Sequence, residues 1–190
     1  VKYKYGGLLT TLSYFYIDQE NVIDIDVGSG KYRRAADGRD KFKGVEWTVN
    51  GKLAPKWTVT GGLMYIDAKR DKTQGGKNDG RFVNGVADWS GVLGLVYEPN
   101  DSLGIIGRVV WNDAAYIDNS NAPSGKTKIP SYTTFDLGVN YKTHLGGIPV
   151  SLSAMCYNVA NKDYWMGRGS STTFGLSMPR TFMLSARFEF

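Results

Sequence analysis

The sequence predicts an all-β protein: a segment of an antiparallel, up-and-down β-barrel that spans a membrane. Three observations predict this class: apolar and polar residues alternate in several segments, the connections between these segments are short and long in turn, and aromatic residues mark the ends of two segments. Alternation with a period of two places one set of side chains on each face of a strand. No run approaches the roughly 18 consecutive apolar residues of a membrane helix, so a chain of this composition would cross a membrane as strands.

The composition fits one domain with a sizeable core. The chain has 190 residues, 42% of them hydrophobic, with 24 glycines, 12 tyrosines and 5 tryptophans. This balance suits strands and turns better than helices. The single cysteine, Cys156, excludes an internal disulfide and a thiolate metal site, and His144 is the single histidine. The chain starts at Val1 without an initiator methionine or a leader, so we expect a fragment or a processed chain.

The last ten residues, 181–190, show the alternation most clearly. One face is apolar and carries Phe182, Leu184, Ala186, Phe188 and Phe190. The other face is mostly polar or charged. An aromatic residue at position 190, in register with the apolar face, predicts a strand that is paired to its last residue, at the periplasmic lip of a barrel wall. We expect this strand to pair with residues 150–158 on one side and with a strand outside this chain on the other.

The other expected strands follow in order along the chain. They cover residues 1–5, which read as the tail of a strand, and residues 8–17, 45–49, 57–67, 87–97, 103–111, 133–141 and 150–158. This gives about eight full strands and one partial strand.

The connections between these strands differ in length. Short turns are expected at residues 6–7, 51–56, 98–102 and 143–148, and long polar loops at residues 18–43, 68–81, 113–131 and 159–179. For residues 18–43 we expect a loop, with extension of the strands into its two ends as the alternative. Because every second connection is long, the long loops gather at one end of the sheet, as they do in outer-membrane barrels with tight periplasmic turns.

Two strands carry an aromatic residue at each end of the apolar face. Trp57 and Tyr65 form one such pair, Trp89 and Tyr97 the other, and the members of each pair are eight residues apart. At about 3.3 Å per residue and a tilt near 40°, this spacing covers roughly 20 Å along the membrane normal. It therefore predicts an apolar band between two aromatic girdles, to which Phe190 is also assigned. Aromatic residues in the core of a soluble β-sandwich are the alternative.

The opposite face of the strands carries ionisable residues, namely Glu46, Asp88, Arg108, Asp136, Arg187 and Glu189. A small barrel with a dry core could bury so many charges only if each one were paired. A water-filled or plugged lumen has no such restriction. The sequence shows no catalytic constellation, no zinc-ligand spacing and no phosphate-binding glycine loop. We therefore expect no enzymatic activity, no metal site and no cofactor.

Four stretches resemble the C-terminal part of a TonB-dependent outer-membrane receptor, most closely the ferric-siderophore branch. They are KGVEWTVNGKLAPKWTVTGGLMYIDA (residues 43–68), IPSYTTFDLGVNYK (129–142), VSLSAMCYNVANKDYW (150–165) and MPRTFMLSARFEF (178–190). They occur in the order found in the family and cover most of the chain. Val159 and Asn161 stand where the family usually has Leu and Asp.

The resemblance implies a 22-stranded barrel with an N-terminal plug domain inside it. Residues 1–190 would be the C-terminal portion of that barrel, and the plug domain would not be present in this chain. The implied function is active transport of a ferric siderophore, or a similar iron chelate, across the bacterial outer membrane, energised through TonB. The implied partners are the iron chelate, outer-membrane lipid and lipopolysaccharide, the TonB complex through the missing N-terminal region, and the remainder of the same barrel.

A small complete barrel of about eight strands, acting as a structural protein or a passive pore, is the alternative to the receptor. The net charge of +5 also fits a nucleic-acid-binding protein. However, no basic and aromatic face repeats on one side of the expected sheet, so we expect no nucleic-acid partner.

The long loops carry the candidate ligand-binding residues, which are basic or aromatic: Tyr32, Arg33, Arg34, Tyr116, Tyr164, Trp165 and Arg168. At the mouth of a receptor such side chains can attract an anionic ferric chelate and stack on its planar parts. The alternative is that the loop cations pair with lipopolysaccharide phosphates or with acidic neighbours such as Asp37 and Asp71.

Overall fold

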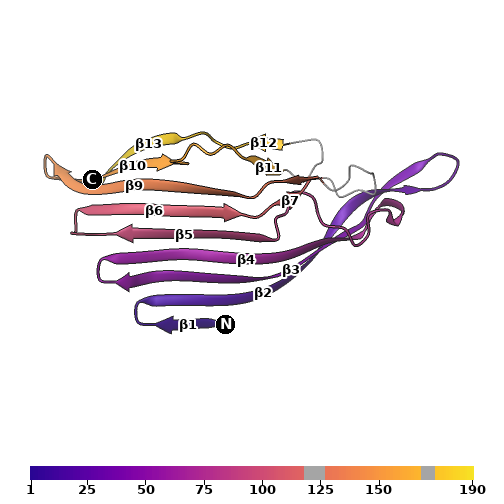
Figure 1. Ribbon diagram of the computed structural model, residues 1–190, viewed down its shortest axis with the longest axis horizontal. Coiled ribbons are helices and arrows are strands. Elements are labelled where there is room, and N and C mark those ends of the chain that lie inside the picture. The colour runs from indigo at the N-terminus through magenta and orange to yellow at the C-terminus, as the bar shows by residue number, and fades with distance from the viewer. Residues whose placement is uncertain (118–126, 168–173) are drawn as a thin grey trace.

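A computed structural model describes residues 1–117, 127–167 and 174–190. Nine strands form one antiparallel sheet in the order β1-β2-β3-β4-β5-β6-β9-β10-β13. Figure 1 shows this sheet face-on, with tight hairpin turns at one end and the longer connections at the other. The predicted all-β, antiparallel, up-and-down architecture is confirmed.

The strands of the large sheet are β1 (Lys2–Tyr5), β2 (Leu8–Asp26), β3 (Tyr32–Ala54), β4 (Trp57–Lys72), β5 (Trp89–Tyr97), β6 (Leu103–Asn112), β9 (Tyr132–Leu145), β10 (Ile148–Tyr157) and β13 (Thr181–Phe188). The long connections contain the short 3-10 helix η1 (Gln74–Gly76) and two further hairpins, β7 (Ala115–Tyr116) with β8 (Lys128–Ile129) and β11 (Trp165–Gly167) with β12 (Phe174–Leu176). Among the described residues, no helix is both long and apolar enough to span a membrane.

One inside–outside alternation runs through the whole sheet. Trp47 is paired with Leu12 on one side and with Leu63 on the other, so the apolar residues of neighbouring strands lie on the same face. This face is exposed: 54% of Leu137 and 73% of Phe182 are accessible to solvent. Since no second sheet covers this face in the part of the chain that is described, it does not form the core of a soluble sandwich. The apolar face is suited to contact with the lipid tails of a membrane.

The aromatic residues at the strand ends meet in pairs across β4 and β5. Trp57 is in register with Tyr97, and their ring centroids are 4.6 Å apart. Tyr65 is in register with Trp89, and their ring centroids are 5.0 Å apart. Each of the two expected girdle levels therefore has one aromatic pair on the apolar face.

The expected pairing of the closing strand with β10 is confirmed. Val150 pairs with Phe188 and Tyr157 with Thr181, and the intervening residues follow in register. The expectation that the strand continues to residue 190 is wrong, because β13 ends at Phe188. Only the backbone N–H of Glu189 still bonds the sheet, donating to the Pro149 carbonyl at 3.1 Å. Phe190 lies beyond the strand, fully exposed.

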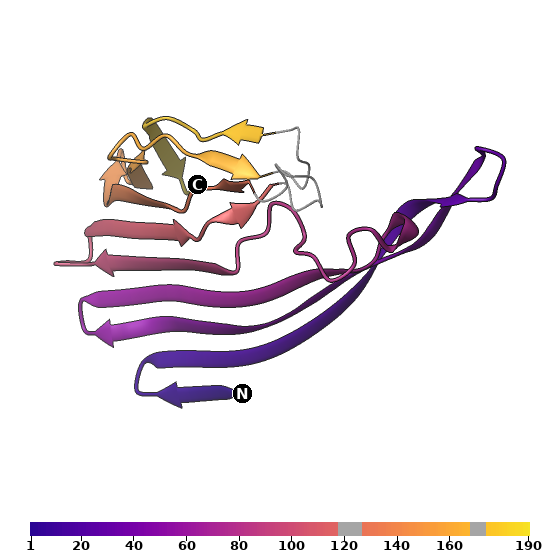
Figure 2. The same ribbon diagram turned by 45° about the vertical axis from the view of Figure 1, so that its right-hand side comes forward.

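The prediction of a loop over residues 18–43 is also wrong, and the alternative of extended strands is correct. Strands β2 and β3 continue to Asp26 and from Tyr32, so only a tight turn joins them. Figures 1 and 2 show the resulting hairpin as a curved arm that projects beyond the rest of the sheet. We call residues 18–43 the arm.

Ion pairs across the strands explain why so polar a segment forms strands. Arg39 lies 3.5 Å from a carboxylate oxygen of Asp18 and 3.2 Å from one of Glu20, and Arg34 lies 3.1 Å from one of Asp24. Opposite charges facing each other across a ladder stabilise strand pairing without any apolar face.

Two short turns are tighter than expected. Strand β3 runs to Ala54, into the turn expected at residues 51–56. Strand β9 runs to Leu145, and Gly146 and Gly147 alone make the turn expected at 143–148. Both glycines have positive φ, 59° and 84°, which a two-residue hairpin turn requires.

The two faces of β9 give a direct test of this arrangement. Leu137 lies on the apolar outer face and Asn140 on the inner face, and both are exposed. Through Gly107 and Leu95, Leu137 is in register with a level between the girdle residues Trp89 and Tyr97. We expect Leu137→Arg to destabilise the intact barrel by about 2 kcal/mol, because an arginine that faces lipid between the two girdles is poorly solvated. The matched variant Asn140→Arg should cost far less. Urea unfolding in lipid vesicles measures both, and equal losses for the two variants would contradict the assignment of faces.

Candidate functional site

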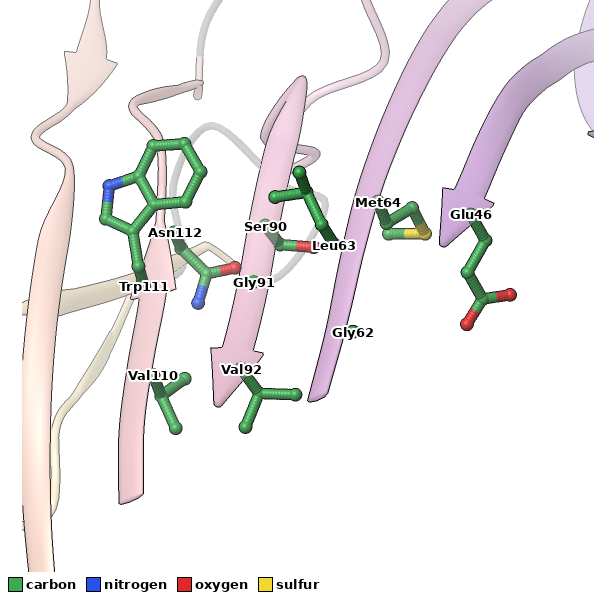
Figure 3. Close-up of a pocket in the computed structure, with 10 residues that line it drawn as sticks. All are labelled: Glu46, Gly62, Leu63, Met64, Ser90, Gly91, Val92, Val110, Trp111 and Asn112. Carbon is green, nitrogen blue, oxygen red and sulfur yellow. The ribbon is translucent and has the colours of Figure 1, made fainter. Parts of the chain in front are cut away.

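The inner face of the sheet carries a shallow depression of about 320 Å³. Figure 3 shows the side chains around it, with Glu46 of β3 at one end and Asn112 of β6 at the other. Gly62 forms part of its floor, where the lack of a side chain leaves room. The Glu46 carboxylate has no ion pair or hydrogen bond among the described residues. It is therefore available to a positively charged partner in the lumen.

Further along the inner face, Arg108 of β6 holds Asp136 of β9. The Nε and Nη2 atoms of Arg108 each lie 2.7 Å from Oδ2 of Asp136. Asp136 is only 4% exposed, whereas the Arg108 side chain is 44% exposed. The guanidinium also lies 5.7 Å from the ring centroid of Tyr157, within the range of a cation–π contact. A buried carboxylate requires such a partner because its desolvation is costly.

The other oxygen of Asp136 binds the start of the last long connection. Its Oδ1 accepts the backbone N–H of Asn158 at 2.8 Å. Asn158 has a positive φ of 50°, which turns the chain out of β10. The last connection has an outgoing limb, which follows Asn158, and a returning limb, which leads to β13. The Asn158 side chain bonds both limbs, through the backbone of Lys162 on the outgoing one and the carbonyl of Met178 on the returning one. We call Arg108, Asp136 and Asn158 the clasp.

The clasp lies close to an aromatic pair. Tyr164, on the outgoing limb, stacks on Tyr132 of β9 with ring centroids 3.8 Å apart. The Tyr132 hydroxyl accepts a hydrogen bond from Asn112 at 2.9 Å. The backbone N–H of Tyr164 donates to the Ser177 hydroxyl at 3.1 Å. The side chain of Tyr164 is therefore held against the end of the wall rather than left free in solvent.

The connections β4–β5 and β6–β9 pack together into a second cluster. Phe82 and Tyr116 stack with ring centroids 5.0 Å apart. The Lys69 ammonium lies 3.3 Å from the Phe82 centroid, and that of Lys128 lies 4.2 Å from the Tyr116 centroid. A small core beneath them consists of Ala115, Ile117 and Ile129, with Ala87 against it. We call this group the loop cluster.

The arm is tied to β4 and meets the η1 segment. The Lys72 ammonium lies 2.6 Å from Oδ1 of Asp37, and this hydrogen bond lowers the pKa of the Asp37 carboxyl. A cavity of about 540 Å³ lies between the arm and η1, with Tyr32 and Gln74 on its walls. Most charges that line it are already engaged in ion pairs or turn hydrogen bonds, so the cavity has no surplus cation for an anionic ligand.

The structure does not gather the predicted ligand-binding residues into one site. Tyr32, Arg33 and Arg34 lie near the tip of the arm, and Arg34 is paired with Asp24 as the alternative of acidic neighbours expects. Tyr116 belongs to the loop cluster, while Tyr164 and Trp165 lie on the last connection. Arg168 lies outside the described residues. Their role in ligand binding therefore stays a prediction.

Sequence reasoning missed the clasp and the loop cluster. The alternation predicts Asp136 only as one of several charges that face the lumen, and Asn158 only as the end of a strand. The Asn-x-x-Asn-Lys sequence at 158–162 was the available signal, because asparagine tolerates positive φ and bonds nearby backbone groups.

Comparison with known proteins identifies the relatives of this architecture. A family profile described as TonB dependent receptor-like, beta-barrel, matches residues 1–159. The ferrichrome receptor FcuA of Yersinia enterocolitica is 27% identical over 98% of this chain and 24% of the receptor. The ferripyoverdine receptor of Pseudomonas aeruginosa is 26% identical over the whole chain and 24% of the receptor.

Solved structures agree with these relatives. BauA, the ferric preacinetobactin receptor of Acinetobacter baumannii, superimposes with a TM-score of 0.84 and 27% identity, over 100% of this chain and 28% of BauA. The Pseudomonas aeruginosa ferripyoverdine receptor bound to ferripyoverdine gives a TM-score of 0.72 with 25% identity, over 97% of this chain and 25% of the receptor. The chain thus spans about a quarter of the length of these receptors.

The loop cluster makes a quantitative prediction. Replacing Phe82 and Tyr116 by leucine, singly and together, should show a coupling free energy of about 1 kcal/mol, as expected for stacked aromatic rings. Hydrogen exchange of the Gly85 amide, which donates to the Tyr116 carbonyl at 2.6 Å, reports the opening of the cluster. The Phe188→Leu change, on the outer face of β13, serves as the control. Strict additivity of the two leucine variants would show that the rings do not hold the loops together.

Proposed function

This chain belongs to the TonB-dependent receptor β-barrel family, and on that premise we propose that it forms the C-terminal portion of a receptor that imports a ferric siderophore or a similar iron chelate. It is a segment of an outer-membrane β-barrel. The observation that carries the proposal is the superposition of the whole chain on the ferric preacinetobactin receptor. Members of the family are transport receptors, and we propose no enzymatic role for this one.

The open sheet supports the view that other strands complete the barrel. Strands β1 and β13 are its two edges, and as the first and ninth strands of an antiparallel sheet they run in the same direction. They could close the sheet only by pairing in parallel, whereas single-chain bacterial barrels are built from antiparallel pairs. We therefore propose that the remainder of the same barrel pairs with both edges. This also disfavours a small complete barrel acting as a passive pore.

The inner face suits contact with another part of the receptor. A plug domain, supplied by the rest of the protein, is the partner we propose for the depression beside Glu46. An unpaired carboxylate there favours a lysine or arginine of the plug, and glycine in the floor allows close approach. Coupling to the TonB complex would act through that region and outside residues 1–190.

The extracellular ends supply the proposed contacts with the iron chelate. Tyr164 and Trp165 on the last connection and Tyr116 of the loop cluster offer aromatic surface, and Arg33 of the arm has no ion pair among the described residues. Cations and aromatic rings favour an anionic, planar chelate. Cations on the outer face, such as Lys43, would face the phosphates of lipopolysaccharide, which we propose as a second partner.

A transport assay tests the proposed function. Cells that express the intact receptor should accumulate iron-55 from one class of ferric chelate, hydroxamate, catecholate or carboxylate. Accumulation should fall to background when the proton gradient across the inner membrane is collapsed, because uptake through TonB needs energy. A deletion of the receptor is the control. Uptake that survives loss of the gradient, or ion conductance of the purified protein in planar bilayers, would instead support a passive pore.

A further inference from the structure

The clasp connects the barrel wall to the last long connection. Asp136 uses one oxygen for Arg108 and the other for the backbone of Asn158. Asn158 in turn binds the Lys162 carbonyl at 2.9 Å and the Met178 carbonyl at 3.0 Å. An unbroken path of hydrogen bonds therefore leads from β6 through β9 and the end of β10 to both limbs of the connection.

A second asparagine fastens the same two limbs. The side-chain oxygen of Asn161 accepts the backbone N–H of Arg180 at 2.8 Å, next to the start of β13. Like Asn158, Asn161 has a positive φ of 50°. Its bond to the returning limb adds to that of Asn158, so the geometry of the connection depends on how residue 158 is held.

The negative charge of Asp136 determines how strongly Asn158 is bound. Asp136 and Asn158 are 4% and 5% exposed, so water cannot replace the bond between them. If the carboxylate lost its charge, the bonds from Arg108 and from the Asn158 amide would both weaken, because charged acceptors bind more strongly than neutral ones. Arg108 is partly exposed on the inner face, so the charge pair also borders the lumen.

We propose that Asp136 is a positioning residue whose charge fixes the last extracellular connection and, with it, the place of Tyr164 above the lumen. Tyr164 stacks on Tyr132 and shares two hydrogen bonds with Ser177, and both Tyr164 and Ser177 belong to the connection that the clasp holds. An effect of Asp136 on chelate affinity rests on the proposed function. An effect of Asp136 on the structure of the connection does not depend on it.

Hydrogen exchange in the intact, ligand-free receptor tests the first consequence. The backbone amides of Lys162, Tyr164, Ser177 and Arg180 are all bonded within the connection. In Asp136→Asn, which keeps the shape of the side chain, these amides should exchange about tenfold faster. Arg108→Lys keeps the positive charge but cannot reproduce the two guanidinium bonds, so it should give an intermediate rate.

Asp67→Asn is the matched control, because Asp67 also pairs with lysines, at 3.4 Å and 3.6 Å, but far from the clasp. It should leave these amides unchanged. The Val83 and Gly85 amides of the β4–β5 connection should also be unaffected in Asp136→Asn. Unchanged exchange in Asp136→Asn, or faster exchange in every connection alike, would overturn the proposal.

Affinity tests the second consequence. For a chelate that the wild-type receptor binds, Asp136→Asn should weaken binding about tenfold while the midpoint of urea unfolding stays within the range of the Asp67→Asn control. Faster exchange with unchanged affinity would overturn the role of the clasp in placing Tyr164 for the ligand. If the wild-type receptor binds no ferric chelate, the proposed function fails, and the exchange result still decides whether Asp136 positions the connection.

Discussion

The structure depends on one constraint, which is that backbone polar groups inside a bilayer must be hydrogen-bonded within the protein. Nine strands meet it by pairing in a continuous antiparallel ladder. Once the ladder is fixed, the two-residue period decides which side chains face lipid and which face the lumen. The apolar outer face, the paired aromatic residues and the charged inner face all follow from that single register.

Outside the bilayer the constraint is relaxed, and other interactions hold the chain. Ion pairs stabilise the arm, aromatic rings capped by lysines join two connections, and asparagine side chains fasten the last one. Each of these uses polar or charged groups that the outer wall excludes. The connections at this end of the sheet therefore keep defined shapes with a small apolar core, formed among the described residues by Ala115, Ile117 and Ile129.

Sequence patterns predicted the features that depend on strand pairing, namely the position of the wall strands and the face on which each side chain lies. Alternation located the wall strands, and spacing placed Trp57 and Tyr65 on one face, which the pairing with β5 confirms. The same reasoning failed over residues 18–43, because charge pairs contribute to holding this hairpin together and its apolar alternation is short, at Ile23, Ile25 and Val27. It also missed the clasp, since the meeting of Arg108 with Asp136 depends on the register between β6 and β9, and no local pattern encodes that register.

The central claim is that this sheet is an arc of a larger barrel and does not close on itself. Paired cysteines in the intact receptor, with Cys156 replaced by alanine, test it most directly. Ser153→Cys with Ser185→Cys, which face each other across β10 and β13, should be joined by a short thiol cross-linker in outer membranes. Lys4→Cys with Arg187→Cys, on the two edge strands, should remain unjoined. Efficient cross-linking of the edge pair would show that β1 and β13 are neighbours and would contradict the account.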